Sequence, residues 1–561
     1  MSTGSAPHGT HSEGPREGAL GASGAGVRTW TNWAGNQSCR ARVLRPTSEP
    51  ELCRIVAEAA ARGHTVRAVG SGHSFSDVAL SDSVLVDLSA YDRVLAIDRD
   101  ASTMTVQSGA RLADLSRSSW PRGMAFTNLG DIEVQTVAGA TQTATHGTGV
   151  AFGNLSSAVV GMRLIDGTGT VRVLDADHEP ALFAAARAGL GALGLVSTVT
   201  VSMSPAFNLH AVHEPRRVDE VLERFGELVR DNDHFEFFWV PGTGWAITKR
   251  HRRNHDPVTP RSRRDEWLQD ELYDNVLFGL ANRVGRWRAG WGREVARRIP
   301  SPGRVEFNDR SYRVFASPRR VDEVLERFGE LVRDNDHFEF FWVPGTGWAI
   351  TKRHRRNHDP VTPRSRRDEW LQDELYDNVL FGLANRVGRW RAGWGREVAR
   401  RIPSPGRVEF NDRSYRVFAS PRRVRFVEME YAVPIEATVE AVQRVRALVD
   451  GLGYPLSFPV EVRTSAADDI ALSTASGRAT GWIAVHMYRG VPYEEYFRGV
   501  EAIMVELDGR PHWGKLHRRT PADLAPVYPR WDEFQELRAR LDPSGVFQNA
   551  ALDRVLGPLG G

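Results

Sequence analysis

The chain has almost no cysteine and no marked excess of either charge. Cys39 and Cys53 are its only cysteines and lack the spacing of a metal site, so we expect neither a disulfide scaffold nor a bound metal ion. Two free thiols fit a reducing compartment, which predicts a cytoplasmic protein. Lysine and arginine number 73 against 70 acidic residues, and this net charge of +3 gives no reason to expect nucleic acid as a partner.

Long apolar runs are also missing. No uncharged apolar stretch approaches the ~20 residues of a membrane-spanning helix, so we expect no integral membrane segment, and peripheral attachment stays open. Residues 1–27 are rich in Gly, Ser, Ala and His and have no apolar signal-peptide core, which predicts a disordered tail. The length of 561 residues allows two or three domains with sizeable cores.

A glycine turn follows a short apolar stretch near the start of the chain. Residues 64–69 read as a buried strand, and the turn after it consists of Gly70, Ser71, Gly72, His73 and Ser74. Glycine lets the backbone turn tightly, and successive N–H groups in such a turn can converge on an anion. A histidine beside them suits a phosphate-bearing cofactor whose reactive ring lies near the imidazole. An ordinary surface turn is the plainer alternative.

A second segment, 137–149, consists almost entirely of Ala, Gly and Thr. Such residues let the backbone lie flat against a large ligand and offer hydroxyls and amides to its polar edges. A glycine-rich loop without a ligand is the alternative. The candidate ligand contacts in this segment are Gly139, Thr143, His146, Gly147 and Gly149.

The elements around these segments favour an α+β fold rather than a doubly wound sheet. Thr47 or Ser48 can cap a helix. Its apolar stripe consists of Leu52, Ile55, Val56 and Ala59. Residues 94–98 and 103–107 predict a hairpin, and 112–120 predict a short helix, so that strands and helices alternate irregularly.

The literal pattern G-x-G-x-x-G occurs once, from Gly189 to Gly194. A dinucleotide site requires this pattern between a strand and a helix, so that the N-terminus of the helix faces the pyrophosphate. Here a helix-like segment, 181–188, precedes the pattern and a strand-like segment, 196–201, follows it. We therefore predict a helix-to-strand connection and no Rossmann site.

The middle of the chain contains a duplication. Residues 215–317 recur without a change as 318–420, an offset of 103. A solenoid would have shorter, diverged units in about three or more copies, so this repeat is a very recent tandem duplication or an assembly error. Because the chain is continuous with both flanking parts, we expect the start of the first copy and the end of the second copy to belong to the folded domain. We expect about one copy's worth of chain to be extruded or loosely docked.

Each copy predicts an amphipathic helix, a strand (235–240 in the first copy) and a basic loop (249–257). In the loop, His251 and His255 are four residues apart, as in zinc-binding helices, but no glutamate follows the first histidine and Pro257 interrupts the pattern. No nucleic-acid-binding module accompanies the basic residues. We therefore interpret the segment as a solvated loop, with no metal and no nucleic acid.

Polar residues gather in the C-terminal part in three elements. Glu461 and Arg463 are two apart in a predicted strand and therefore point to one face of a sheet. His486 lies in a second strand, and His512 and Lys515 lie in the run 510–517. Singly, these features are a surface ion pair, a core histidine and a helix entry. Together they supply a carboxylate, a guanidinium, an imidazole and an ammonium, which suffice to bind a polyhydroxy substrate and remove its proton.

With the two glycine-rich segments, these residues resemble the FAD-dependent sugar-1,4-lactone oxidases (L-gulono- and D-arabinono-1,4-lactone oxidases) of the vanillyl-alcohol-oxidase superfamily. The resemblance covers about residues 28–210 and 421–557, and single-copy parts of the region between. It implies FAD held in a two-subdomain, PCMH-type domain and joined covalently to His73. Gly130 stands where the family's oxidases tend to have glycine, which favours O2 as the electron acceptor.

The resemblance also implies roles for the C-terminal residues. Glu461 and Arg463 correspond to the pair that clamps the substrate, and His486 corresponds to a pocket histidine that assists proton removal. The run Pro-His-Trp-Gly-Lys corresponds to a family signature, which implies that Lys515 lies near the flavin N1–C2=O edge. A cation there would stabilise the anion formed when N5 accepts hydride. His512 would line the same cavity.

The implied reaction is oxidation of the C2 hydroxyl of an aldono-1,4-lactone by hydride transfer to flavin N5, giving an ascorbate-type product and H2O2. An alditol oxidase of the same superfamily and a lactone dehydrogenase with a cytochrome or quinone acceptor remain alternatives, as does a non-catalytic duplication product. We expect four parts: a tail (1–27), the FAD-binding domain (28–210), an α+β substrate or cap domain (211–520) and a C-terminal segment that returns to the FAD domain (521–561).

Overall fold

The structure, a computed structural model, describes most of the chain on either side of the duplication and parts of both copies. The described residues are 26–217, 228, 231–239, 245–255, 318–326, 328–329, 337–342, 348–357, 412–418, 425–452 and 460–559. The expected tail and most of the first copy's expected helix therefore lie outside the described residues. Within these ranges, no helix is long and apolar enough to cross a bilayer.

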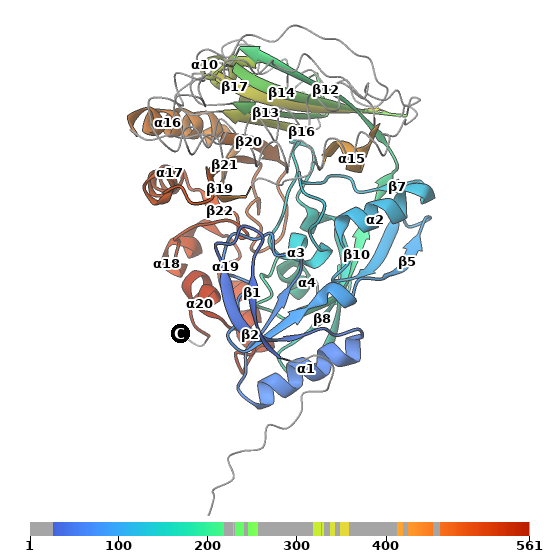
Figure 1. Cartoon of the computed structure of the whole chain (residues 1–561). Helices are drawn as coiled ribbons and strands as arrows, with labels where there is room; N and C mark the ends of the chain where they lie inside the picture. Colours follow the sequence, from blue (N-terminus) through green and yellow to red (C-terminus); the bar gives the residue numbers. More distant parts are fainter. Residues whose placement is uncertain are drawn as a thin grey trace, which may run out of the picture.

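The first subdomain is a small mixed sheet in the order β1-β2-β4-β3, with one helix packed on it (Figure 1). Its elements are β1 (Val27–Thr31), β2 (Ser38–Leu44), α1 (Glu49–Ala61), β3 (Val66–Val69) and β4 (Val84–Asp87). All four residues of the apolar stripe predicted on α1 are buried, as expected. The helix cap differs from the expectation, because Ser48 makes no capping side-chain bond. Instead, the Thr47 N–H donates to the Glu51 carboxylate over 3.0 Å.

The second subdomain is an antiparallel sheet in the order β5-β6-β10-β8-β9. Its strands are β5 (Val94–Asp98), β6 (Thr103–Gln107), β8 (Val159–Ile165), β9 (Val171–Asp175) and β10 (Leu195–Ser202). The associated short elements are α2 (Leu112–Ser119), β7 (Met124–Ala125), α3 (Val137–Gln142), α4 (Pro180–Ala186) and β11 (Ser204–Pro205). The predicted hairpin is confirmed as β5–β6. The segment 189–194 joins α4 to β10, so that the helix-to-strand order is also confirmed.

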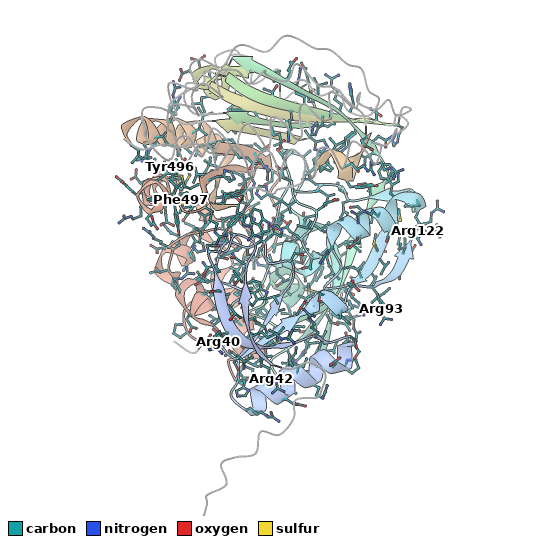
Figure 2. All side chains as sticks on the ribbon, viewed as in Figure 1. Arg40, Arg42, Arg93, Arg122, Tyr496 and Phe497 are labelled. Carbon is teal, nitrogen blue, oxygen red and sulfur yellow. The ribbon has the colours of Figure 1, made fainter. Side chains whose placement is uncertain are left out.

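Within the described residues, a ten-stranded sheet starts in the upper layer of Figure 1 and continues downward through β21, β19 and β22, in the order β12-β15-β17-β14-β13-β16-β20-β21-β19-β22. Its strands are β12 (Asn208–Arg217), β13 (His234–Trp239), β14 (Trp245–Asn254), β15 (Pro318–Arg320), β16 (His337–Trp342), β17 (Trp348–Asn357), β19 (Phe426–Pro434), β20 (Val460–Ser465), β21 (Thr480–Tyr488) and β22 (Arg510–Pro511). Its helices are α10 (Val321–Glu326), α15 (Ser414–Phe418), α16 (Thr438–Gly451) and α17 (Glu494–Glu506). Tyr496 and Phe497 of α17, labelled in Figure 2, belong to the core that this sheet shares with α16.

Both copies of the duplicated segment contribute strands to this sheet. About one copy's worth of chain was expected to be extruded or loosely docked, and most of both copies lies outside the described residues. Val460 and Glu461 of β20 are backbone partners of both β13 and β16, the equivalent strands of the two copies. Likewise Asn208 of β12 pairs with Asn254 of β14 and with Asn357, its equivalent in β17. One edge of a strand pairs with only one neighbouring strand at a time, so the two identical sequences are alternative partners for β20.

The prediction of a basic loop over 249–257 is wrong for most of that range, because Lys249–Asn254 belongs to β14. The charges are buried rather than solvated, since carboxylates on the neighbouring strands face them. Lys249 Nζ lies 3.1 Å from Glu236 of β13, and Arg250 Nη2 lies 2.6 Å from Glu214 of β12. A local count of charges could not identify these partners.

The C-terminal helices α18 (Pro521–Leu524), α19 (Trp531–Leu541) and α20 (Ala550–Leu556) lie beside the N-terminal sheet in Figure 1. The Val66 N–H of β3 donates to the Val546 carbonyl over 2.7 Å. The Asn549 amide donates to the carbonyls of Val78 and Leu80 over 3.1 and 2.8 Å. The segment after residue 540 therefore completes the first subdomain.

Arg67 of β3 is the buried centre of this junction. Its Nε donates to the Val78 carbonyl over 3.0 Å, and its Nη1 donates to the Gly191 and Phe547 carbonyls over 3.0 and 2.9 Å. Its Nη2 donates to the Leu190 carbonyl over 2.5 Å. Burial lowers the pKa of Arg67 to about 10, so it remains a cation at neutral pH. One side chain thus ties together the glycine turn's strand, the 189–194 connection and the C-terminal segment.

Candidate functional site

A cavity opens where β3 ends in the glycine turn. Its walls come from that turn, from α3 and the residue before it, from the connection into β10, and from Phe547 of the C-terminal segment. Several residues predicted to contact a cofactor line it, namely Gly70, Ser71, Gly72, His73, Ser74, Gly139 and Thr143. The cavity therefore brings together the two glycine-rich segments that sequence analysis singled out.

The absence of a side chain at Gly70 is a geometric requirement. A Cβ added there would lie 2.3 Å from Thr136 Oγ1 and 2.8 Å from Thr136 Cγ2. Thr136 cannot simply turn away, because its hydroxyl accepts the Gly139 N–H over 3.2 Å and so caps α3. The two loops thus pack backbone against side chain and leave a smooth wall that suits an extended phosphate-bearing ligand.

His73 lies at the cavity rim and faces the C-terminal part of the chain. Its ring stacks on Trp33, with centroids 5.1 Å apart. Burial, together with the Lys515 ammonium, lowers the pKa of His73 to about 4, so the imidazole is neutral at pH 7. Just beyond it, the Phe75 N–H donates to the Gly514 carbonyl over 2.7 Å. The turn that lines the cavity is therefore bonded to the segment that carries His512 and Lys515.

The chemistry of these residues fits FAD. The cavity is lined by glycine backbone and hydroxyl groups, and a neutral imidazole stands at its rim. Outside the cavity lining, on the side of the C-terminal group, Gly147 packs on Asn128, because a Cβ there would lie 2.3 Å from Asn128 Oδ1. The Asn128 amide is buried, and neither its nitrogen nor its oxygen bonds a protein group within the described part of the chain. A ligand with both donors and acceptors would satisfy it.

The four residues predicted to be catalytic lie in one buried group. Arg463 and Glu461 on β20 form an ion pair, which agrees with their expected common face. His486 on β21 lies 3.9 Å from Glu461. Lys515 comes from the segment after β22 and joins the group through Glu428, a residue that was not predicted. The structure thus brings a guanidinium, carboxylates, an imidazole and an ammonium to one place.

Three carboxylates of this group were missed by sequence analysis. Glu428 Oε2 lies 2.5 Å from Lys515 Nζ, and its Oε1 lies 3.4 Å from His486 Nε2. Glu430, two residues further along β19, lies 3.1 Å from His146 and 3.9 Å from Lys515. Asp131 lies 2.9 Å from Arg463. The available signal was two acids alternating with apolar residues in an otherwise buried strand, 426–434.

The charges of this group control one another. Burial alone would raise the pKa of Glu428 and Glu430, but Lys515 and the facing histidines outweigh it and hold both pKa values below the usual range. Burial opposes the charge on Arg463, but Asp131 and Glu461 outweigh it and raise its pKa. Burial lowers the pKa of His512 to about 3, so this imidazole is neutral. The site therefore combines ionised carboxylates with a neutral histidine.

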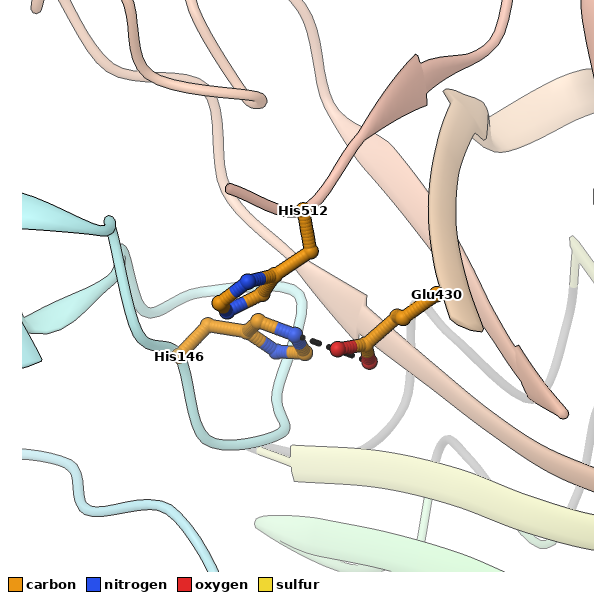
Figure 3. A group of neighbouring side chains, drawn as sticks. All are labelled: His146, Glu430 and His512. Atoms are coloured by element: carbon orange, nitrogen blue, oxygen red, sulfur yellow. Dashed lines mark hydrogen bonds and ion pairs between the residues drawn. The ribbon is translucent and has the colours of Figure 1, made fainter. Parts of the chain in front are cut away.

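The remaining predicted cofactor residues adjoin this group rather than the cavity. A Cβ at Gly130 would lie 3.0 Å from the His146 carbonyl oxygen, and the Gly149 N–H donates to the Thr464 carbonyl of β20 over 2.9 Å. Figure 3 shows His146, Glu430 and His512 converging from separate segments. The 128–149 segment therefore runs from the cavity wall into the C-terminal cluster.

Side chains of the types that bind metals also converge here. The three groups, within the part of the chain that the structure describes, are His146 with Glu430 and His512, Glu428 with Glu461 and His486, and Asp131 with Glu236 and Glu461. Their carboxylates already face protein cations, namely Lys515, Arg463 and Lys249. We therefore assign no metal to them.

Comparison with known proteins agrees with the cavity and the cluster. A family model described as an FAD binding domain matches residues 41–175, and one described as D-arabinono-1,4-lactone oxidase matches residues 199–323 and 317–555. The solved structure of a solvent-stable cholesterol oxidase has a TM-score of 0.64 at 18% identity and covers 95% of this chain and 98% of its own, which shows a common fold. These findings define an FAD-dependent oxidoreductase that acts on CH–OH groups.

Two curated relatives narrow the class. L-gulono-1,4-lactone dehydrogenase of Mycobacterium tuberculosis (strain ATCC 25618 / H37Rv) is 39% identical over 532 residues, which are 94% of this chain and 99% of that protein. L-gulonolactone oxidase of Mus musculus is 27% identical over 531 residues, which are 93% and 97% of the two chains. The chain belongs to the D-arabinono-1,4-lactone oxidase family.

Proposed function

We propose that the protein oxidises the C2 hydroxyl of an aldono-1,4-lactone, such as L-gulono- or D-arabinono-1,4-lactone, to a 2-keto lactone that enolises to an ascorbate-type product. The observation that carries this proposal is the buried group of Glu461, Arg463, His486 and Lys515, which is bonded through residues 512–515 to the glycine turn of the cofactor cavity. A small polyhydroxy ring with one carbonyl matches these donors and acceptors.

Each residue has a definite task in this reaction. Arg463 donates to the lactone carbonyl and ring hydroxyls, and its charge is maintained by Asp131 and Glu461. His486, 3.4 Å from the Glu428 carboxylate, accepts the proton of the C2 hydroxyl. As that O–H bond breaks and the C2=O bond forms, the C2 hydrogen leaves with its electron pair. FAD, when bound, supplies the two-electron acceptor.

Lys515 and His73 would hold the cofactor in place. Burial and the charge of the Lys515 ammonium lower the pKa of His73, so the two side chains lie close enough to interact. A neutral imidazole has a free lone pair, which a covalent bond to the flavin methyl group requires. We therefore propose that His73 carries the flavin covalently.

The proposed electron acceptor is O2, which would be reduced to H2O2. The support for this acceptor is the identity of residue 130, since the family's oxidases tend to have glycine there; a Cβ at Gly130 would lie 3.0 Å from the His146 carbonyl oxygen. The name dehydrogenase of the relative at 39% identity favours the alternative of another acceptor.

The test uses the purified full-length protein. With L-gulono-1,4-lactone in air, we expect bleaching of the flavin band, its return, and one H2O2 for each lactone consumed. Arg463→Met should lower kcat/KM by about 100-fold or more, since it removes a charged donor to the substrate. A surface variant, Arg122→Met, is the matched control. Xylitol in place of the lactone tests the alditol alternative. Turnover with an artificial dye but not with air would show that O2 is not the electron acceptor.

The same sample tests the bond to His73. After acid precipitation, the pellet should stay yellow, whereas the His73→Ala pellet should be colourless and leave any flavin in the supernatant. Failure of both the lactone and xylitol to bleach a fully loaded yellow protein would overturn the proposed function.

A further inference from the structure

Outside the proposed catalytic residues, the ring of His146 has an environment that fixes its protonation. Its Nδ1 lies 2.8 Å from the Gly147 carbonyl oxygen, and its Nε2 lies 3.1 Å from Glu430 Oε1. A carbonyl oxygen and an ionised carboxylate only accept hydrogen bonds, whereas a neutral imidazole has a single N–H to donate. Both contacts are hydrogen bonds only when both ring nitrogens carry a proton.

The surroundings suit a buried cation. The side chains of His146 and Glu430 are 2% and 3% exposed, so each charge needs the other as its partner. The imidazole ring stacks on Trp482 with centroids 3.7 Å apart and planes at 14°, and an indole face attracts a cation. The indole is fixed in turn, because its N–H donates to Ser465 Oγ over 2.9 Å.

Glu430 also holds the segment that carries His512 and Lys515. Its backbone carbonyl accepts the His512 N–H over 2.9 Å, and the Glu428 carbonyl accepts the Leu516 N–H over 2.9 Å. The Glu430 side chain lies 3.9 Å from Lys515, whose closer carboxylate, at 2.5 Å, is Glu428. As long as His146 neutralises Glu430, Lys515 faces one uncompensated carboxylate rather than two.

We propose that His146 and Glu430 form a buried imidazolium–carboxylate pair that acts as a positioning unit for Lys515 and His512. The pair joins residues separated by 284 positions, one in the FAD-binding part and one in the substrate part. Its effect on turnover rests on the proposed function, but its protonation does not. Within the part of the chain that the structure describes, the charged or titratable groups that face it are Glu428, Arg463, His512 and Lys515.

Removal of either charge of the pair should disturb the position of Lys515 or the protonation of His146. In His146→Gln, Glu430 becomes an uncompensated buried carboxylate next to Lys515 and draws the ammonium away from Glu428 and the cofactor. In Glu430→Gln, an isosteric change, the imidazole has no anion to hold its second proton. Each variant should lower kcat about 10- to 100-fold while KM for the lactone changes less than about threefold, because the pair positions groups that act in the reaction.

The decisive measurement is nuclear magnetic resonance of the holoenzyme labelled with 15N-histidine at pH 7.5. We expect one ring with two slowly exchanging N–H protons, which is lost in His146→Gln and has a single N–H in Glu430→Gln. His178→Gln is the matched control: it changes a histidine that pairs with Asp175 but whose side chain is 71% exposed, and it should affect neither the signal nor kcat.

A second readout is the flavin absorbance spectrum, which should shift in both single variants because the charge beside Lys515 changes. The double variant His146→Gln/Glu430→Gln removes both charges together and should be no slower than the worse single variant. A wild-type ring with only one N–H would overturn the proposal, even if every variant misfolds. If wild-type protein shows the doubly protonated ring but does not oxidise lactone, the proposed function fails and the ion pair stands.

Discussion

The contacts around the cofactor cavity and those in the duplicated segment differ in how many alternative partners they have. Around the cavity, each contact has one possible partner: Arg67 meets four particular carbonyls, and Thr136 fills the space above Gly70. In the upper sheet, β13 and β16 have the same sequence and share backbone partners at Val460 and Glu461 of β20. The candidate site depends on the unique part, because all of its predicted residues precede residue 215 or follow residue 420.

This contrast shows where a duplication is tolerated. The repeated segment, 215–420, supplies strands to one side of the sheet, whereas β19, β20, β21 and the 510–517 run supply the candidate catalytic groups. The second copy therefore provides equivalent strands that can take the same positions in the sheet. It neither adds nor displaces a candidate catalytic side chain.

The largest expected effect tests whether the two copies substitute for each other. Phe237 of β13 is fully buried, and Phe340 is the same residue of the second copy. Phe237→Ala or Phe340→Ala alone should lower the free energy of unfolding by less than about 1 kcal/mol, because the strand of the other copy can occupy the same position in the sheet. The double variant should cost about 3–5 kcal/mol, as expected for a buried phenylalanine. Urea unfolding measures the stability of the two single variants and the double variant. If one single variant is as unstable as the double variant, only that copy occupies the buried position.

A smaller effect is expected for a lesion in the unique part, where no second copy can compensate. Gly70→Ala places a Cβ 2.3 Å from Thr136 Oγ1, and relief of this overlap costs about 1–3 kcal/mol. Retention of FAD should fall about 10- to 100-fold, measured as flavin absorbance per protein after gel filtration. Gly451→Ala is the control, since a Cβ there meets nothing within 4 Å. Unchanged flavin content in Gly70→Ala would contradict the proposed cradle.

At neutral pH the smallest effect is that of His512, whose contribution to stability appears only in acid. The pKa of His512 is about 3 in the folded protein against about 6.5 in an unfolded chain, so between these values only the unfolded chain binds the proton. Stability should therefore fall as the pH drops from about 6.5 to 3, with this residue contributing up to about 1.4 kcal/mol per pH unit. His512→Asn should flatten the dependence of unfolding free energy on pH. Equal slopes in both proteins would contradict the buried neutral imidazole.

Sequence patterns predicted the features that arise from short-range order. The stripe on α1, the β5–β6 hairpin and the order of α4 and β10 follow from local periodicity and turn residues. The period of two in β20 likewise placed Glu461 and Arg463 on one face, where they form an ion pair.

Features that depend on distant charges were not predictable in this way. The basic run of β14 reads as a solvated loop until Glu214 and Glu236 are seen on the adjacent strands. Glu430 has no partner within its own element, because His146 lies 284 residues away in the chain. The burial of a charge is decided by the partner that the fold supplies.

The bonds of Arg67 have a consequence for the timing of maturation. Phe547 forms part of the cavity wall, and its carbonyl accepts from Arg67 across 480 residues of intervening chain. A ribosome that has made the glycine turn must therefore synthesise nearly all of the remaining polypeptide before the pocket can close. We therefore expect flavin to bind only after residue 547 has left the ribosome.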